Sequence, residues 1–460
     1  MNHPYYQEFL GSMKQFEPIT SDQVKKESKG VFGLDELSIF LLERGLSSEK
    51  VVYDPTRLYL NTFYADYENG LYIPMLLSRI FLKHPDSFDS ALEQHRKAAG
   101  LLQNKDWSKF YEDHVPTSML IYDFERRLYD IEPEKVFDIW LRLYTRIDYS
   151  NGQWDPQTLD YVFAHAQKPS QLPQVNDKSE MITIYRGMGS LSQSAETAIS
   201  WSSDPVNALW FANRSGCGKA LAVGEIPPQE VVAYRAGFWN ENEIIVQPYT
   251  VRNIRYENMI PVTKENVLKL TVPALPDYMR YGKQAERLGY KPEGSFSYHG
   301  SKHILRVLLL SLIYYYNSKD TLSEADKGIL VYFSLLHDIG RTNDDKDDRH
   351  GALSVEYIKK RNLRVGSLSL TKKEYQISHL IIQYHCLDDD MGIQVIQALN
   401  NCTKKEKEHV VRLYQICKDM DALDRVRFNG LNYQKLRTSY SRQLPLIVGE
   451  LLKEDIMSIL

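Results

Sequence analysis

ILVYFSLLHDIGR, residues 329–341, sets the expected architecture of the C-terminal third of this chain. Eight residues without a charge precede the pair His337 and Asp338, and Gly340 follows. A helix with so few polar positions is expected to be buried among other helices. Adjacent helical residues point about 100° apart, so both polar side chains can serve one site only where the helix ends or is crossed. Gly340 predicts such an end.

Further His and Asp residues occur at the ends of neighbouring apolar segments with the helical period. His303 opens KHILRVLLLSLIYYY, His350 begins a helix in RHGALSVEYI, His385 follows IIQY, and Asp421 lies in CKDMDALDRVR. Imidazole nitrogens and carboxylate oxygens bind divalent transition metals, and facing helices can project them into one core. We therefore predict an all-α domain, residues 298–460, with a metal site inside it. A capping box at Ser323 and Asp326 marks the start of the helix that ends in the His-Asp pair.

The order of these motifs resembles the HD superfamily of metal-dependent phosphohydrolases. The shared elements are an upstream His with Arg three residues later, the HDIG core, an HG before a helix of small residues, a His after IIxx, and a D-x-L-D near the end. The resemblance implies a divalent metal, with Mn, Mg, Fe, Zn and Ni not distinguished, and hydrolysis of a phosphoester or phosphoanhydride. It implies direct metal ligands at His303, His337, Asp338 and Asp421, with Asp338 also catalytic. It further implies substrate-phosphate or second-metal ligands at His350, His385, Arg341 and Arg306.

Several residues near this series keep two interpretations. Arg306, Arg341 and Arg425 either clamp phosphate bidentately or form surface salt bridges. Asp424 either orients a metal ligand or is an acid on the helix surface. His299 precedes the pattern, and we expect a structural role for it.

Short β-like runs separated by Gly, Pro and Asn replace the helical period in the middle of the chain. They predict a mainly antiparallel β domain, residues 176–265, and their sequences are MITIYRG, KALAVGEI, EVVAYRA, NEIIVQPYTV and RNIRYENMIPV. Three triplets occur in and near these runs, at residues 185–187 (YRG), 200–202 (SWS) and 241–243 (ENE).

The order of the three triplets resembles ADP-ribosyltransferases of the arginine-serine-glutamate class, which are glycosyltransferases that use NAD. Their chemistry cleaves the nicotinamide bond, and a carboxylate stabilises the positive charge that develops on the ribose. The resemblance implies cofactor binding by Arg186, Gly187, Ser200 and Ser202, and catalysis by Glu243 with Glu241 orienting an acceptor arginine. Phe238 or Trp239, in the loop before Glu241, would contact the target protein. The competing interpretation is an ordinary sheet with solvated acids and core aromatics.

The remaining segments are predicted from periodicity and breakers. Residues 1–175 read as a mainly helical lobe, as in DELSIFLLERGL and PEKVFDIWLRLYTRI, whose aromatic residues we expect in the core. This lobe would precede the sheet and support NAD. Residues 266–297 have few periodic features and read as a linker.

Composition limits the partners and the compartment. The chain of 460 residues has a formal charge of −4, so no electrostatic reason exists to expect nucleic-acid binding, whereas a small nucleotide needs only a local pocket. Four scattered cysteines without a CxxC pair favour a reducing, cytoplasmic compartment. No apolar stretch reaches the length of a membrane span. Delivery into a host cell by a specialised secretion system leaves no such sequence signal and stays open.

These observations favour a bifunctional enzyme: an NAD-dependent mono-ADP-ribosyltransferase, modifying an unidentified protein, fused to an HD phosphohydrolase. The hydrolase would act on the ADP-ribosylated product or on an unrelated nucleotide. One alternative is an HD nucleotide phosphohydrolase whose N-terminal part only binds a ligand or protein. Another is a non-catalytic interaction protein, which requires two separate constellations of residues to be accidental.

Overall fold

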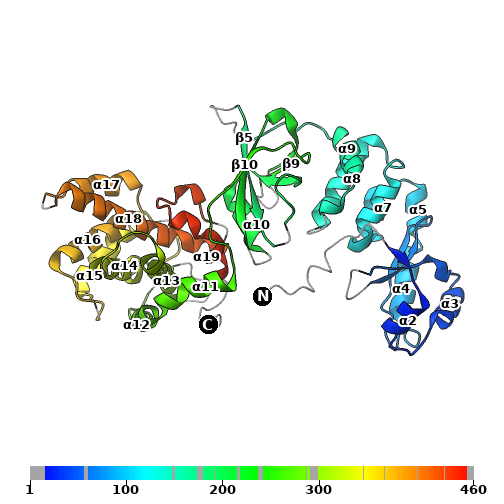
Figure 1. Ribbon diagram of the computed structural model, residues 1–460, viewed down its shortest axis with the longest axis horizontal. Coiled ribbons are helices and arrows are strands. Elements are labelled where there is room, and N and C mark those ends of the chain that lie inside the picture. Colours follow the sequence, from blue (N-terminus) through cyan, green and yellow to red (C-terminus); the bar gives the residue numbers. More distant parts are fainter. Residues whose placement is uncertain are drawn as a thin grey trace.

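The computed structural model describes residues 16–55, 61–147, 151–173, 180–190, 192–214, 218–236, 242–285, 287–290, 299–345, 347–366, 368–400, 402–428 and 430–452. Its parts follow one another along the long axis of the molecule (Figure 1). A C-terminal helical bundle lies at one end, a six-stranded sheet is central, and helices α8 and α9 connect the sheet to a small N-terminal sheet at the other end. The chain thus combines helices and antiparallel sheets in a multidomain layout.

The N-terminal region contains a four-stranded antiparallel sheet that the sequence analysis did not predict. Its strands, in the order β1-β2-β3-β4, are β1 (Glu17–Pro18), β2 (Val51–Tyr53), β3 (Thr62–Asp66) and β4 (Leu71–Pro74). Helices α2 (Ser21–Glu27), α3 (Leu34–Leu42) and α4 (Asp86–His95) contribute to its core. The prediction of a mainly helical lobe holds for most of this region but missed the sheet, because these strands are too short for their aromatic and β-branched residues to outweigh the helical period around them.

The helices that follow form a second core, rich in aromatic side chains. They are α5 (Ala98–Gln103), α6 (Trp107–Asp113), α7 (Leu120–Arg127), α8 (Pro133–Arg146) and α9 (Pro156–Ala164). Trp140 and Phe124 are fully buried, which confirms the core role predicted for the aromatics of this region. The same core includes Ala233 and Ile245 of the central sheet and Ile199 just before β6, so the helical region and the sheet pack together.

The central sheet has six strands in the order β10-β7-β5-β6-β9-β8, and every neighbouring pair is antiparallel. This confirms the predicted antiparallel sheet. The strands are β5 (Ile182–Met188), β6 (Ser200–Ser202), β7 (Ala220–Ile226), β8 (Val231–Arg235), β9 (Glu243–Val246) and β10 (Arg252–Tyr256). Helix α10 (Pro205–Arg214) packs between this sheet and the C-terminal bundle, with whose core its Ala208, Leu209 and Ala212 are continuous.

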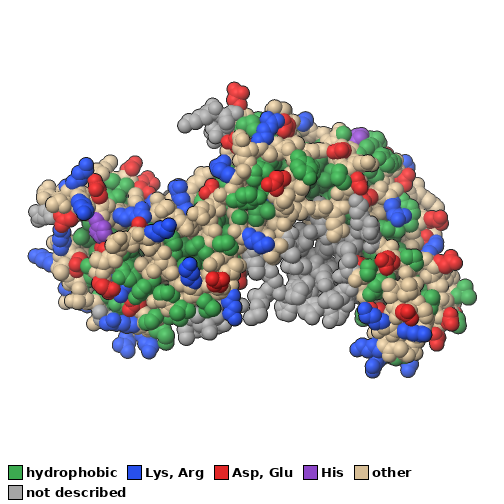
Figure 2. Space-filling model, viewed as in Figure 1, with side chains coloured by type: hydrophobic (Ala, Val, Ile, Leu, Met, Phe, Trp, Pro, Cys, Tyr) green, Lys and Arg blue, Asp and Glu red, His purple; other side chains and the backbone are tan. Residues whose placement is uncertain are grey.

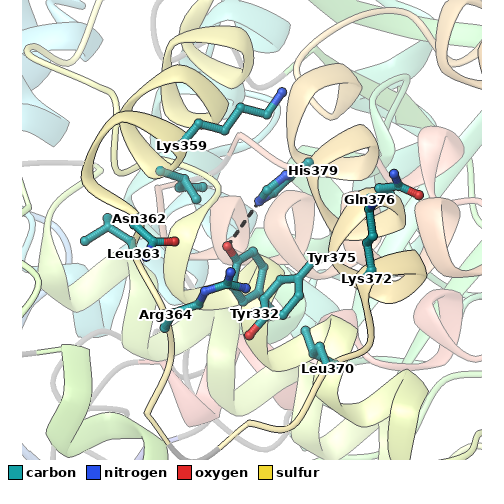
Figure 3. Close-up of a pocket in the computed structure, with 11 residues that line it drawn as sticks. Tyr332, Lys359, Asn362, Leu363, Arg364, Leu370, Lys372, Tyr375, Gln376 and His379 are labelled. Carbon is teal, nitrogen blue, oxygen red and sulfur yellow. Dashed lines mark hydrogen bonds between the residues drawn. The ribbon is translucent and has the colours of Figure 1, made fainter.

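The C-terminal region is helical, as predicted. Its helices are α11 (Lys264–Thr271), α12 (Leu275–Ala285), α13 (Ser301–Asn317), α14 (Glu324–Leu336), α15 (His350–Arg361), α16 (Lys372–Tyr384), α17 (Asp389–Gln397), α18 (Lys404–Leu423) and α19 (Pro445–Leu451). Helix α13 buries 10 of its 17 residues, and α14 begins at the predicted capping box, where the Asp326 amide donates to Ser323 Oγ at 3.2 Å. A pocket opens between α14, α15 and α16 (Figure 3).

The segment predicted as a linker, residues 266–297, instead supplies helical structure to this bundle. Val267 and Leu270 of α11 and Tyr281 and Ala285 of α12 are buried in its core. The prolines in VPALPDY hid the helical period from the sequence analysis, but proline is compatible with the first turn of a helix. Residues 291–298 lie outside the described residues.

Short 3-10 helices connect these elements in the described part of the chain. They are Ser48–Lys50, Thr117–Met119, Asn151–Gln153, Pro228–Glu230, Val272–Ala274, Asp424–Phe428, Tyr433–Lys435 and Ser441–Gln443.

Two expectations from composition concern the distribution of charged side chains on the surface and the apolar character of the helices. Acidic and basic side chains are interspersed over the described residues on the face seen in Figure 2. Among the helices of the described part, none combines the length and the apolar character needed to cross a membrane.

Candidate functional site

The predicted His and Asp residues of the C-terminal bundle meet at the ends of five helices. His303 lies in the first turn of α13, His337 caps the end of α14 and is followed by Asp338, His350 begins α15, His385 caps the end of α16, and Asp421 lies in the last turn of α18. The expectation that α14 ends at the His-Asp pair is confirmed. All but Asp421, which is partly exposed, are buried.

One group of donor atoms surrounds His303 Nε2. His337 Nε2 lies 3.1 Å from it, Asp421 Oδ1 lies 3.2 Å from it, and Asp338 Oδ2 lies 3.7 Å from it. Donors that bind one ion at about 2.1 Å are separated from one another by about 3.0 to 3.4 Å. His303, His337 and Asp421 therefore group as donors for one cation, and Asp338 lies slightly farther out, at 3.7 Å from both imidazoles.

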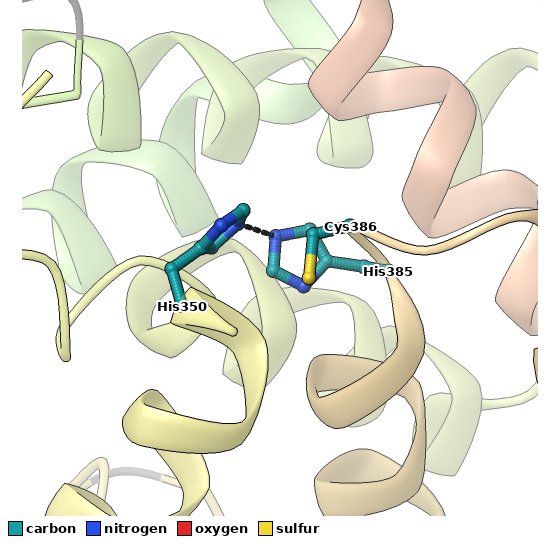
Figure 4. Close-up of side chains that lie close together, drawn as sticks. All are labelled: His350, His385 and Cys386. Atoms are coloured by element: carbon teal, nitrogen blue, oxygen red, sulfur yellow. Dashed lines mark hydrogen bonds between the residues drawn. The ribbon is translucent and has the colours of Figure 1, made fainter. Parts of the chain in front are cut away.

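A second group of donors lies on the other side of Asp338. Asp338 Oδ1 is 3.3 Å from His350 Nε2 and 3.7 Å from His385 Nε2, and these two nitrogens are 2.9 Å apart. Figure 4 shows the two imidazoles facing each other, with Cys386 beside His385. The Asp338 carboxylate thus lies between the two groups, with one oxygen toward each.

The hydrogen bonds at Nδ1 fix the protonation of these rings. The Nδ1 atoms of His337 and His385 lie 3.2 Å and 2.6 Å from the backbone carbonyl oxygens of Phe333 and Ile382, and His350 Nδ1 contacts the carbonyl oxygen of Asp347. A carbonyl oxygen only accepts, so Nδ1 carries the proton and the Nε2 lone pair points inward. Lone pairs this close repel unless a cation lies between them.

Without a metal ion, a proton takes that place. Burial alone would lower the pKa of His303, but its hydrogen bonds to Asp421 and Asp424 raise that pKa to about 10. Burial alone would likewise raise the pKa of Asp338, yet its neighbours His337 and His299 hold it well below its usual range. The donor set is therefore built to hold positive charge.

Asp424 holds His303 in place, which decides between the two interpretations of Asp424 that the sequence left open, an orienting group or a surface acid. The carboxylate is 1% exposed, accepts from His303 Nδ1 at 2.8 Å, and also accepts from Arg306 Nη2 at 3.2 Å. Asp424 is therefore not a surface acid. Arg306 was predicted to face substrate phosphate or a second metal, and its guanidinium is instead committed to Asp424.

The other flanking residues differ in their distance from the donors. Arg341 donates from Nε to Asp338 Oδ1 at 3.2 Å and is 9% exposed, whereas Arg425 is exposed. His299, expected to be structural, places Nδ1 2.9 Å from Asp338 Oδ2 and belongs to the cluster. His299 lies before α13, where the sequence has no helical period. Its closeness to His303 in the sequence was the available indication that it belongs to the cluster.

Cys386 is a donor that the sequence analysis did not place in the site. Its Sγ groups with His350 and His385, and it donates to the carbonyl oxygen of Asp348 at 3.3 Å. Burial raises the pKa of this thiol. Its position directly after His385 was the available signal.

Gly351 explains why a glycine follows His350 at the start of α15. A Cβ at this position would lie 2.5 Å from the carbonyl oxygen of Ile382 and 2.8 Å from that of Gln383, both in the backbone of α16. The missing side chain lets α15 and α16 approach closely. That approach brings His350 and His385 together.

The central sheet brings together three of the residues assigned to NAD chemistry. Arg186, Ser200 and Glu243 lie on the adjacent strands β5, β6 and β9. Arg186 Nη1 donates to the carbonyl oxygen of Ser200 at 2.6 Å, and Ser200 Oγ donates to Glu243 Oε1 at 2.7 Å. Burial lowers the pKa of Arg186, whose Nε has no hydrogen-bond partner in the described part of the chain.

Two further side chains hold the Glu243 carboxylate. Tyr144 of α8 donates to Oε1 at 2.5 Å, and Arg235 of β8 donates from Nη1 to Oε2 at 2.9 Å. Glu243 is only 8% exposed as a result. Tyr144 was interpreted as part of an apolar helix face, and nothing in the sequence joins it to a residue 99 positions later.

The other predicted cofactor residues have roles in local structure. Ser202 Oγ accepts from the backbone amide of Asp204 at 3.0 Å, just before α10. A Cβ on Gly187 would lie 1.8 Å from the carbonyl oxygen of Ala208, so this glycine permits the contact between β5 and α10. Glu241, with Phe238 and Trp239, lies outside the described residues.

Comparisons with protein-family models, with curated proteins and with solved structures found no match to this chain.

Proposed function

We propose that the C-terminal bundle is a metal-dependent phosphohydrolase. The observation that carries this proposal is the convergence of four imidazole Nε2 atoms on Asp338, with the tautomers of the rings fixed by acceptors at Nδ1. Buried lone pairs and carboxylates in this arrangement favour a divalent cation. The motif resemblance to the HD superfamily favours a phosphate ester or anhydride as the substrate.

The donors divide into two ligand sets that share Asp338. His303, His337 and Asp421 would hold one ion, and His350 and His385 a second, with Cys386 beside it. Bound ions supply Lewis acidity, which makes water nucleophilic at neutral pH and neutralises phosphoryl charge.

The protein supplies orientation around those ions. Asp424 and the backbone carbonyls hold the rings, so no ligand has to reorganise when charge develops. Arg341 places a fixed positive charge next to Asp338, and His299 is the imidazole of the cluster with the more open position, at 22% side-chain exposure. We assign His299 to contact with the substrate phosphate, and Arg341, which already donates to Asp338 Oδ1 and to the carbonyl oxygen of Asp345, to holding the Asp338 carboxylate.

Hydrolysis by the full chain tests this proposal. Bis(p-nitrophenyl) phosphate and a panel of nucleotides would be incubated with the chain and Mn2+. Asp338→Asn removes the shared charge and should abolish turnover, whereas Asp320→Asn, a carboxylate paired with Arg412 away from the site, should retain it. Equal activity of the two variants would overturn the proposal.

We further infer an NAD-dependent mono-ADP-ribosyltransferase in the central sheet, with protein arginine as the acceptor. The supporting observation is the hydrogen-bonded series Arg186, Ser200 and Glu243 on three neighbouring strands. Arg186 would bind NAD phosphate. Its buried Nε has no hydrogen-bond partner among the described residues and could donate to a phosphate oxygen. Glu243 would stabilise the developing charge on the ribose.

A competing proposal keeps the N-terminal region as a ligand- or protein-binding module without catalysis. The observation in its favour is that three donors already occupy the Glu243 carboxylate. Labelling with radioactive NAD separates the two proposals. Glu243→Gln should abolish label transfer if the transferase exists, with Glu225→Gln on the same sheet as the matched control, and an absence of labelling by the unmodified chain in target lysates would favour the binding module.

The joint activity and the setting are proposals as well. The hydrolase would act on the pyrophosphate of the attached ADP-ribose or on a separate nucleotide. The cysteines Cys386, Cys402 and Cys417 are free thiols, which fits the proposed reducing compartment, either the cytoplasm of the producing cell or that of a host. If the unmodified chain and its Asp338→Asn variant give the same ADP-ribosylated product, the coupled scheme is refuted.

A further inference from the structure

A second cluster of basic and aromatic side chains lies in the bundle outside the proposed metal-ligand groups. It lines a pocket of about 580 Å³ between α14, α15 and α16. Pockets for small organic ligands have volumes of about 300 to 1,000 Å³, which is far more than a lone phosphate ion fills. The size therefore fits a molecule with an organic body.

The charges on the pocket are of one sign. Lys359, Arg364 and Lys372 come from different sides of the opening and are exposed (Figure 3). Among the described residues that line the pocket, none is Asp or Glu. Three cations without a paired acid on the wall favour an anionic ligand, and phosphate oxygens accept hydrogen bonds from lysine and arginine.

The interior of the pocket is suited to a planar, polar group. Tyr332 forms the floor at 1% exposure, and its Oη lies 3.2 Å from His379 Nε2. Tyr375 is partly buried beside them, and the Arg364 guanidinium lies 4.2 Å from the centre of its ring. A guanidinium that stacks on an aromatic ring also offers its other face to a planar ligand.

The pocket and the metal ligands are at different positions on the same helices. Tyr332 precedes His337 on α14 by five residues, and His379 precedes His385 on α16 by six. At 1.5 Å per residue these separations are about 8 to 9 Å along the helix axes. A ligand in the pocket would thus contact the helices of the metal centre without occupying that centre.

We propose that this pocket binds a mononucleotide-sized organic phosphate as a site separate from the metal centre. The rim cations contact the phosphate, and the Tyr332, Tyr375 and His379 wall contacts the planar body. This binding does not depend on the bundle being a hydrolase.

Titration of the full chain with fluorescent N-methylanthraniloyl-ADP tests the proposal. EDTA in the buffer removes divalent ions, so binding at the metal centre does not contribute. Charge reversal by Arg364→Glu or Lys372→Glu should weaken binding at least about tenfold, because each replaces an attractive phosphate contact by a repulsive one. Lys360→Glu is the matched control, since Lys360 is exposed on the same helix as Lys359 but does not line the pocket.

The competing outcomes are distinguishable. The control should bind as the unmodified chain does, and inorganic phosphate should displace the probe only at a concentration at least about tenfold above that of ADP, because it lacks the planar body. The proposal is overturned by an absence of saturable binding, by a loss below about fivefold in both pocket variants, or by an equal loss in Lys360→Glu. Displacement by phosphate as effective as that by ADP would overturn the planar-body assignment. Thermal melts of the variants exclude unfolding as the cause, since the substituted residues are exposed.

Discussion

Asp424→Asn tests how the proposed metal ligands are held in place. Asparagine keeps the shape of the side chain but loses its charge. Its amide nitrogen, which donates, replaces one of the two oxygens that accept hydrogen bonds from His303 and Arg306. The variant therefore loses charge-assisted hydrogen bonds either at Oδ2, which accepts from His303 Nδ1 at 2.8 Å and from Arg306 Nη2 at 3.2 Å, or at Oδ1, which accepts from Arg306 Nε. A bond of this kind contributes about 1.5 to 3 kcal/mol.

Two quantities should change by different routes. The free energy of unfolding should fall by about 2 to 3 kcal/mol, because the carboxylate is buried and Arg306 loses its partner. The affinity for Mn2+ or Zn2+ should fall about 10- to 100-fold, as expected for loss of a group that orients a metal-bound imidazole. Urea unfolding of the metal-free chain and titration against a chelator of known affinity measure the two changes.

Asp419→Asn is the matched control on the same helix. Asp419 is fully buried and accepts from the backbone amides of Arg437 and Thr438 at 3.0 and 2.9 Å. Residues two apart on a helix point about 200° apart, so Asp419 and the proposed ligand Asp421 face different sides of α18. This variant should lose comparable stability and keep the metal affinity. Unchanged metal affinity in Asp424→Asn, or an equal loss of affinity in Asp419→Asn, would refute the orienting role.

Three further predictions concern packing, pH and the central sheet. Gly351→Ala places a Cβ 2.5 Å from a carbonyl oxygen of α16, so it should cost about 1 to 3 kcal/mol of stability and also weaken metal binding, and a variant as stable as the parent contradicts the close-approach argument. The raised pKa of His303, about 10 against 6.5 when unfolded, contributes stability that is complete below pH 6.5 and lost as pH rises through 10. The melting temperature of the EDTA-treated chain should therefore fall over this range, and saturating Zn2+, which replaces the proton, should abolish the fall. Tyr144→Phe removes one donor to the Glu243 carboxylate and should cost about 1.5 to 3 kcal/mol in urea unfolding and reduce NAD-dependent labelling, with unchanged labelling as the outcome against its role.

The sequence carried most of the information about the cluster of His and Asp residues because its members lie at the ends of long, apolar helices. His303, His337, His350 and His385 each begin or end a segment with the helical period, and the order of these motifs, through its resemblance to the HD superfamily, predicts that they meet. Asp424 and His299 were harder to assign. Their roles depend on contacts across 121 and 39 positions, respectively, which local pattern does not encode.

The predictions failed where local signals were short or contradictory. Strands β2 to β4 have three to five residues each, too few for a period to be distinguished from the adjacent helices. Pro273 and Pro276 read as helix breakers, yet they stand at the starts of helical turns that pack into the bundle. Tyr144 and Arg235 reach Glu243 only because α8 and β8 lie against β9, which is a property of the tertiary structure.

The metal content of the purified chain, measured by mass spectrometry after reconstitution with Mn2+ or Zn2+ and gel filtration, tests the proposed centre most directly. Two ligand sets that share Asp338 predict about two ions per chain, and His350→Ala should reduce this to about one. Retention of less than about one-tenth of an ion per chain by the unmodified protein would contradict the metal centre and the hydrolase proposed from it.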